Sequence, residues 1–239
     1  MPVTLRPQHS MRLLIAGALL VAGLSSAALT VPRVPHPAGA ACVSATLDSA
    51  GVPFDSASYS RWATPAYTPS MRFRIAHTGD AILLQYIVRE AGAVASVTDD
   101  NGRVFRDACV EFFLSPGAND SYYNFELNCI GSLLLQGGRR GTRRPLATPD
   151  IEALVERHTS LGTAPVDFRG DTVEWQASLI IPKEALFLDS ISDLGGTTMT
   201  ANFYKCGGAE PNYLMWRPIN TERPQFHRPQ DFDTLSFAR

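Results

Sequence analysis

The stretch DACVEFFLSPGANDSYYNFELNCIG, residues 107–131, has the pattern of two β-strands joined by a turn. Successive side chains of a strand point to opposite faces of its sheet. The segment SPGANDS, residues 115–121, is rich in Pro, Gly, Asn and Asp, which favour turns. Apolar residues share one face of each strand: Val110, Phe112 and Leu114 on the first, and Tyr123, Phe125, Leu127 and Cys129 on the second. The stretch therefore predicts a β-hairpin with one apolar face directed at a core.

The apolar faces also predict how the two strands align. If both face the same core, Phe112 lies opposite Phe125, and Val110 lies opposite Leu127. A slip of one residue would turn one apolar set outward, so this register is favoured. The polar residues then pair on the other face, Glu111 opposite Glu126 and Cys109 opposite Asn128.

This polar face has two interpretations. It can be the solvent-exposed side of an antiparallel sheet, which requires no function. It can also be a binding site, because Glu111 directly opposite Glu126 places two like charges together, and something should offset their repulsion. Cys109 and Cys129 lie on opposite faces of the hairpin, so we expect no disulfide between them.

Composition excludes several classes of protein. The chain has 239 residues, of which 45% are hydrophobic and 18% charged, which suits a folded chain with a core rather than a disordered one. The net charge of −2 gives no basic field to attract nucleic acid. The length suits one large all-β domain with an extension.

The extension is an N-terminal targeting segment. Met11 and Arg12 precede the short apolar run LLIAGALLVAGL, and small residues follow as SSAA. This pattern predicts a secretory signal peptide over residues 1–28, and one domain over 29–239 that is secreted or periplasmic. The run is too short for a membrane span, so no membrane association is expected after cleavage. A lipoprotein anchored at Cys42 is a weaker alternative, because prolines intervene.

The remaining sequence contains many short strands separated by turn signals. This is the pattern of an all-β sandwich or barrel. A short helix is expected over 148–158. The basic segment 137–144 is expected to be a solvated loop, with contact to an anionic ligand as the alternative. Strands are expected over 71–77, 81–90, 173–182, 198–206, 212–216 and 234–238, with a helical turn at 182–186.

Known catalytic motifs are missing. No G-x-S-x-G motif occurs, the five histidines show no metal-ligand spacing, and the loop after Asp99 lacks the final glutamate of an EF-hand. Glu111 and Glu126 could in principle act as glycosidase carboxylates, but such a pair normally flanks a cleft rather than sharing one hairpin. No catalytic residue is therefore predicted.

Several motifs, in order, resemble one family. They are RW…PAYTPSMRFRIAHTGDAILLQYIVRE, DACVEFFLSP…YYNFELNCIG, ANFYKCGG and LMWRPINTERPQFHRPQDFDTLSF. Over about residues 43–239 the chain resembles the family-9-like carbohydrate-binding modules of the DOMON-like β-sandwich group. The resemblance implies a jelly-roll-like antiparallel β-sandwich with one or two short helices, non-catalytic, often attached to polysaccharide-degrading enzymes, and with structural calcium.

The resemblance also implies a sugar site. Relatives clamp a terminal sugar between two tryptophans, with charged and amide side chains on its hydroxyls. By motif, the charged residue is Glu111, the amide is Asn128, and the clamp positions are Phe105 and Phe226. This chain departs from the pattern, with Phe at both clamp positions and Glu126 where those relatives carry arginine.

Trp216 lies in the matching segment and is either a ligand contact or a core residue, and Phe226 has the same two interpretations. The predicted carbohydrate-binding residues are Phe105, Glu111, Glu126, Asn128, Trp216 and Phe226. The predicted function is non-catalytic carbohydrate binding by an exported module. The alternative is an exported structural or protein-interaction domain that has lost the sugar site.

Overall fold

The computed structural model describes residues 28–62, 69–117, 121–209 and 212–239. The expected signal peptide, residues 1–28, lies outside the described residues except for its last position. The expected hairpin turn at 115–121 falls partly outside them as well.

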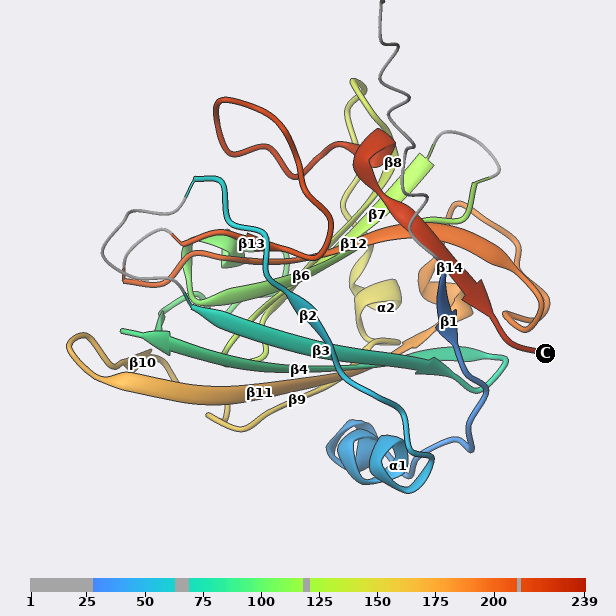
Figure 1. Ribbon diagram of the computed structural model, residues 1–239, viewed down its shortest axis with the longest axis horizontal. Coiled ribbons are helices and arrows are strands. Elements are labelled where there is room, and N and C mark those ends of the chain that lie inside the picture. Colours follow the sequence, from blue (N-terminus) through green and yellow to red (C-terminus); the bar gives the residue numbers. More distant parts are fainter. Residues whose placement is uncertain (1–27, 63–68, 118–120, 210–211) are drawn as a thin grey trace, which may run out of the picture.

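Two β-sheets lie face to face (Figure 1). We call them the large sheet and the small sheet. The large sheet has the order β1 (Leu29–Val31), β14 (Asp233–Phe237), β12 (Thr198–Cys206), β6 (Cys109–Ser115), β7 (Ser121–Asn128) and β8 (Leu133–Arg139), with β13 (Leu214–Met215) beside β12. The small sheet has the order β2 (Asp55–Ala57), β3 (Ser70–His77), β4 (Ala81–Ala91), β11 (Thr172–Pro182) and β9 (Glu156–Thr159). A two-stranded ribbon pairs β5 (Val94–Ala95) with β10 (Val166–Asp167).

The predicted β-sandwich is confirmed, and so is the register of the hairpin. β6 and β7 pair in antiparallel fashion with Phe112 opposite Phe125 and Glu111 opposite Glu126. Within the described strands, the one parallel ladder joins β1 to β14. Register follows from burial here, because a one-residue slip would move Phe112 out of the core.

The main core fills the space between the sheets. Phe112 of β6, Phe203 of β12 and Phe73 of β3 all belong to it and are at most 1% exposed. The rings of Phe73 and Phe203 stack across the sheets with centroids 3.8 Å apart. Truncating such a residue costs about 3–5 kcal/mol, so these rings are a large part of what holds the two sheets together.

The outer face of the small sheet is covered by a helix. Helix α1 (Val43–Ser49) places Val43 and Leu47 against Leu83 and Ile180 in a second apolar cluster (Figure 1). The helix covers one end of this face, where Ala81, Leu83 and Ile180 contact it, whereas Glu174 and Gln176 further along the outer face of β11 are exposed.

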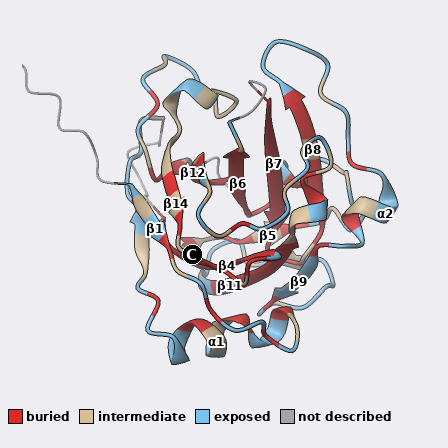
Figure 2. Ribbon diagram, turned by 90° about the vertical axis from the view of Figure 1, so that its right-hand side faces the viewer, coloured by how far each residue is buried: buried red, intermediate tan, exposed pale blue. Residues whose placement is uncertain are grey.

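The outer face of the large sheet is covered too. β6, β7 and β8 are buried over nearly their whole length (Figure 2). An aromatic cluster including Phe113, Tyr122 and Tyr204 lies on this face, with Phe226 and Phe232 from the chain after β13 packed against it. The structure thus excludes a solvent-exposed sheet face as the explanation for the polar residues of the hairpin.

Some predicted elements differ from the structure. The helix expected over 148–158 is limited to α2 (Pro149–Glu152), and the chain then forms β9, which pairs with β11. Helix α1 was not predicted. β8 extends through Arg139 into the expected basic loop, and the strand expected over 212–216 is limited to β13.

The helical turns are short. They are η1 (Ala40–Cys42), η2 (Val104–Arg106), η3 (Lys183–Ala185) and η4 (Pro229–Asp231), and η3 confirms the helical turn predicted at 182–186. Among the described residues, no helix has the length and apolarity needed to cross a membrane. The four cysteines are free thiols, and Cys129 lies in the main core while Cys109 lies in a separate cluster, so the two side chains are on opposite faces of the hairpin as expected.

Candidate functional site

A pocket of about 280 Å³ opens on the outer face of the large sheet. Its floor is made by alternate side chains of four neighbouring strands, which share one face because strand side chains alternate. Its walls come from η2 and from the chain on either side of β13. The lining residues are Phe105, Glu111, Glu126, Leu134, Gln136, Cys206, Tyr213, Pro224, Gln225, Phe226 and His227.

Phe105 is the exposed aromatic wall of this pocket. It lies in η2, and 43% of the residue is exposed. The turn is held in place by the neighbouring Asp107, whose carboxylate accepts hydrogen bonds from the backbone N–H groups of Ser96 and Val97 at 3.1 and 3.0 Å. A large apolar ring held at a pocket mouth with half its surface free is suited to covering a ligand.

Glu111 and Glu126 form the polar floor. They lie directly opposite each other on β6 and β7 and are 3% and 4% exposed. The Cys206 thiol donates to Glu111 Oε1 at 2.9 Å, and Asn124 Nδ2 donates to Glu126 Oε1 at 2.7 Å. Glu126 Oε2 is buried and has no hydrogen-bond partner within the described part of the chain. A buried acceptor without a partner costs free energy, which a ligand donor would recover.

Protonation explains how the two carboxyl groups can face each other. Burial raises the pKa of Glu126 to about 7, although the Asn124 amide and the Arg144 charge act in the opposite direction. Burial, with the nearby Cys206 thiol and Glu126, raises the pKa of Glu111 well above its ordinary value. The pair therefore retains a proton near neutral pH, which removes the repulsion expected from the sequence. A protonated carboxyl group can both donate and accept hydrogen bonds.

His227 closes one corner of the pocket. Its Nδ1 lies 2.9 Å from the Tyr122 hydroxyl and 3.2 Å from the Arg144 guanidinium, which itself stacks 3.8 Å above the Tyr122 ring. Because arginine can only donate, these hydrogen bonds assign the ring proton to Nε2. Burial, followed by the charge of Arg144, lowers the pKa of His227 to about 4, so the ring is neutral at pH 7.

Phe226 belongs both to the pocket and to a packed cluster. Its ring stacks on Tyr204 with centroids 4.1 Å apart and an angle of 6° between the planes. The rings of Trp62 and Tyr213 each lie 5.9 Å away. One face of the Phe226 ring is therefore covered by the protein itself, and the remaining surface borders the pocket.

Comparison with known families places this geometry in context. The sequence profile of carbohydrate-binding family 9 matches residues 41–237, most of the chain. The chain belongs to carbohydrate-binding family 9.

Solved structures agree with this membership. A crystal structure of a Bacteroides uniformis protein, to which carbohydrate binding has been ascribed, is 45% identical, with a TM-score of 0.84 over 88% of this chain and 98% of that one. Two structures of a family 9 module from Caldicellulosiruptor kristjanssonii, in complex with cellotriose and with glucose, share its fold at 14% and 13% identity, with TM-scores of 0.59 and 0.57. Each of these two matches covers 88% of this chain. They cover 93% of the chain solved with cellotriose and 96% of the chain solved with glucose. None of the curated protein sequences matches this chain.

Four of the six residues predicted to bind carbohydrate line this pocket, and two do not. Phe105, Glu111, Glu126 and Phe226 are brought together. Trp216 lies instead in the main core, 2% exposed, and its Nε1 donates to Asp55 at 2.8 Å. Of the two interpretations that the sequence allows for Trp216, ligand contact and core residue, the structure shows the second.

Asn128 is also used inside the protein. Its Nδ2 donates to the Val97 carbonyl at 2.8 Å and to Asp107 at 2.9 Å, and its Oδ1 accepts from the Ile130 and Ser132 amides. Every polar atom of this side chain therefore has a protein partner, and Asn128 does not line the pocket. Its role is to fix the loop beside the pocket.

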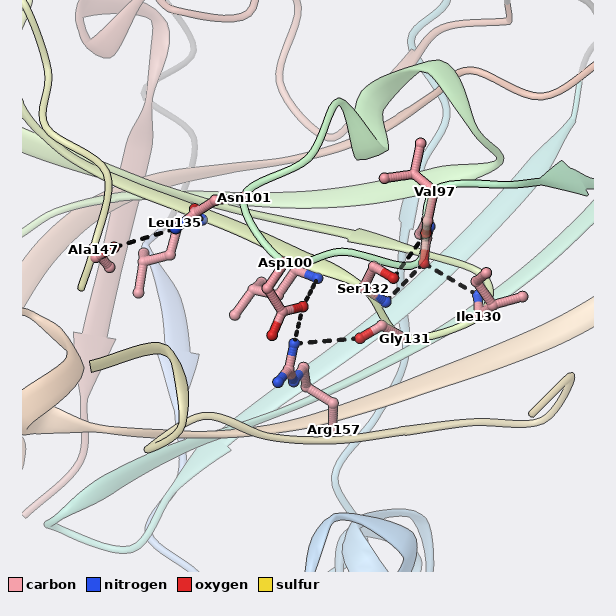
Figure 3. Close-up of polar contacts among 11 residues, drawn as sticks. Val97, Asp100, Asn101, Ile130, Gly131, Ser132, Leu135, Ala147 and Arg157 are labelled. Atoms are coloured by element: carbon pink, nitrogen blue, oxygen red, sulfur yellow. Dashed lines mark hydrogen bonds and ion pairs between the residues drawn. The ribbon is translucent and has the colours of Figure 1, made fainter. Parts of the chain in front are cut away.

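The loop that Asn128 fixes also contains Asp100 and Asn101, whose side-chain oxygens are of the kind that bind calcium. Figure 3 shows Val97, Asp100 and Asn101 held against β8 and its preceding turn. Asp100 Oδ1 accepts from the Leu133 amide and from Arg157, and Asn101 Oδ1 accepts from the Leu135 amide (Figure 3). Calcium takes six to eight oxygen ligands, and these two side-chain oxygens are bound to N–H donors instead.

Several lining residues were missed by sequence reasoning. Leu134 and Gln136 lie on β8, whose pairing with β7 was not deduced from the sequence. Cys206 reaches the site because β12 pairs with β6, a contact between distant parts of the chain. His227 is adjacent to Phe226 in the motif QFHRP, which is a local signal that could have indicated it.

Proposed function

We propose that this chain is an exported, non-catalytic module that binds a saccharide in the pocket on the large sheet. The observation that carries the proposal is the position of the half-exposed Phe105 ring beside the buried Glu111 and Glu126 carboxyl groups. Sugars combine an apolar C–H face with hydroxyl groups that both donate and accept. An aromatic wall over a polar floor matches both properties.

The polar groups of the pocket can serve several hydroxyls. The free Oε2 of Glu126 is an acceptor, and the Glu111 carboxyl group can donate or accept according to its proton. Gln136 offers an amide, and the Nε2–H of the neutral His227 is a donor. In this proposal the floor binds hydroxyls while Phe105 and the free surface of Phe226 cover the ring.

The family supports a class of ligand. The Caldicellulosiruptor kristjanssonii module was solved with cellotriose and with glucose. We extend this class, gluco-configured saccharides, to the present chain. The pocket is small, which favours the end of a chain or a short oligosaccharide over a long stretch of polymer.

Export and partners complete the proposal. The signal-like segment before residue 29 supports secretion or a periplasmic location. A binding module outside the cell would bring polysaccharide-degrading enzymes to their substrate, and we expect such enzymes as its partners. Glu111 and Glu126 sit on adjacent strands rather than on opposite walls of a cleft, which supports binding without hydrolysis.

A glycan-array screen followed by calorimetry tests this function. Purified protein should retain a small set of saccharides, with cellotriose and glucose as the first ligands to titrate. Kd values of about 0.1–1 mM are expected, because phenylalanine offers less stacking area than tryptophan. Incubation with the same saccharides should release no product. Hydrolysis that is lost in Glu111→Gln would overturn the non-catalytic assignment.

One observation favours the alternative of an exported interaction domain. Phe226 stacks on Tyr204, so one face of the expected clamp ring is covered by the protein itself. If no glycan binds at millimolar concentration, the sugar proposal fails and the interaction domain becomes the better account of the fold.

A further inference from the structure

Two cysteines and a glutamate meet beside the pocket floor. Cys109 and Glu111 are two residues apart on β6 and therefore share a face. Cys206 lies directly opposite Cys109 on β12. The two Sγ atoms and a Glu111 carboxylate oxygen all lie within 4.8 Å of one another, and all three residues are buried. Within the described ranges, this is the one cluster of three close metal-ligating side chains.

The spacing of these atoms is close to that of a tetrahedral metal site. Two sulfur ligands 2.3 Å from a zinc ion, at the tetrahedral angle, lie roughly 3.8 Å apart. Cys206 Sγ already lies 2.9 Å from Glu111 Oε1. Small side-chain rotations would therefore bring the three atoms to bonding distance, and the antiparallel ladder that holds both strands need not move.

We propose that Cys109, Glu111 and Cys206 bind a thiophilic divalent cation of the Zn²⁺ class. Thiolates select such ions, and two sulfurs with one oxygen leave a fourth coordination position. Glu111 and Cys206 line the pocket, so this position faces the pocket rather than the core. The ion displaces a proton from each thiol and requires no oxidant or reductant.

The surroundings support a cation at this point. Glu126, 4% exposed, faces Glu111 and lines the same pocket with an unpartnered Oε2. This oxygen lies outside the three-residue cluster and can accept a hydrogen bond from a water molecule on the ion. Asn128, which lies opposite Cys109, is committed to Val97 and Asp107 and does not compete. Lys205, the neighbouring cation on β12, is paired with Glu90 at 2.6 Å.

This site goes beyond saccharide binding and does not depend on it. The metal is detected by its own spectrum, in the absence of any sugar. A failure of metal binding would leave the saccharide proposal intact, and a failure of saccharide binding would leave the metal site intact.

The test is a cobalt titration of the full chain, reduced and handled without oxygen. Co²⁺ substitutes for Zn²⁺ and gives a thiolate charge-transfer band in the near ultraviolet. We expect one equivalent to bind with this band and Zn²⁺ to displace it. Cys109→Ser and Cys206→Ser should each weaken binding by at least about 100-fold, more than the usual loss from an outer partner.

Two further variants keep the test decisive. Cys42→Ser removes the exposed thiol and should leave the titration unchanged. Glu111→Gln keeps both thiolates and should retain the band while weakening binding by about 10-fold. The proposal is overturned by the absence of a band in the reduced chain, by a band that survives in folded Cys109→Ser, or by a Cys109–Cys206 disulfide in the protein as isolated.

Discussion

Replacing Phe105 with alanine should reduce saccharide binding without unfolding the protein. A phenylalanine side chain offers about 200 Å² of surface. With 43% of Phe105 exposed in the free protein, roughly 80–90 Å² remains for a ligand to cover. At about 25 cal/mol per Å², full coverage contributes about 2 kcal/mol, and partial coverage about 1 kcal/mol. Affinity should therefore fall by a factor of about 5 to 30.

The assay measures two quantities on the same preparation: calorimetric binding of a saccharide found in the glycan screen, and the free energy of unfolding. The free energy of unfolding of Phe105→Ala should differ from that of the wild type by less than about 1 kcal/mol, because a half-exposed side chain contributes little to folding. Tyr59→Ala is the matched control, since Tyr59 is an aromatic residue 48% exposed and outside this pocket. It should leave affinity unchanged.

Phe226→Ala gives the contrasting result. Because its ring stacks on Tyr204, truncation should lower both affinity and stability. The reasoning is refuted if Phe105→Ala binds saccharide as tightly as the wild type, or if Tyr59→Ala weakens binding to the same extent.

Three further predictions concern stability, pH and export. Lys205→Ala should destabilise the fold by about 3–5 kcal/mol in chemical denaturation, because Lys205 and Glu90 are buried, 2.6 Å apart, and the carboxylate would lose its charged partner. His227 binds a proton near pH 6.5 when unfolded but only near pH 4 when folded, so below pH 6.5 the unfolded state binds more protons and stability falls. Relative to His227→Gln, the wild type should lose about 1–3 kcal/mol of unfolding free energy between pH 6.5 and pH 4. Mass spectrometry of the exported protein should find its first residue near position 28 or 29.

Each of these has a clear contrary outcome. Lys205→Ala with wild-type stability would mean that the ion pair contributes nothing. A stability difference between wild type and His227→Gln that is constant with pH would show that the folded and unfolded pKa values of this ring are equal. An exported chain that still begins at Met1 or Met11 would remove the argument for a signal peptide.

The hairpin could be predicted from sequence because its information is local. Alternation of apolar residues around Phe112 and Phe125 determines both the faces and the register, so the opposition of Glu111 and Glu126 followed directly. The same reasoning could not tell that this face is buried. The residues that cover it, including Phe226 and Phe232, come from a segment about 100 residues further along the chain.

Strand pairing explains why the helix predicted at 148–158 is shorter in the structure. Thr148 and Pro149 do begin a helix, as their pattern indicates, but it ends at Glu152. The following residues pair with β11, with Glu156 opposite Ile180 and Thr159 opposite Ala177. The edge of the small sheet therefore outweighs the helical propensity of this segment.

In the candidate site, too, local motifs could be recognised from the sequence, whereas contacts between distant parts of the chain could not. Phe105, Glu111, Glu126 and Phe226 could be identified from motifs along the chain. Asn128 matched the motif, yet its amide is consumed by the loop that follows β7, because carboxamides readily satisfy nearby backbone groups. Cys206 could not be placed beside Glu111 without the pairing of β12 with β6.

Saccharide binding in the pocket can be observed in a crystal of the full chain soaked with cellotriose. We expect electron density for a sugar ring in the pocket, with one face against Phe105 and hydroxyl oxygens within hydrogen-bond distance of Glu111 and Glu126. A saccharide bound elsewhere on the protein, or an empty pocket at a saccharide concentration that saturates binding in solution, would contradict this expectation.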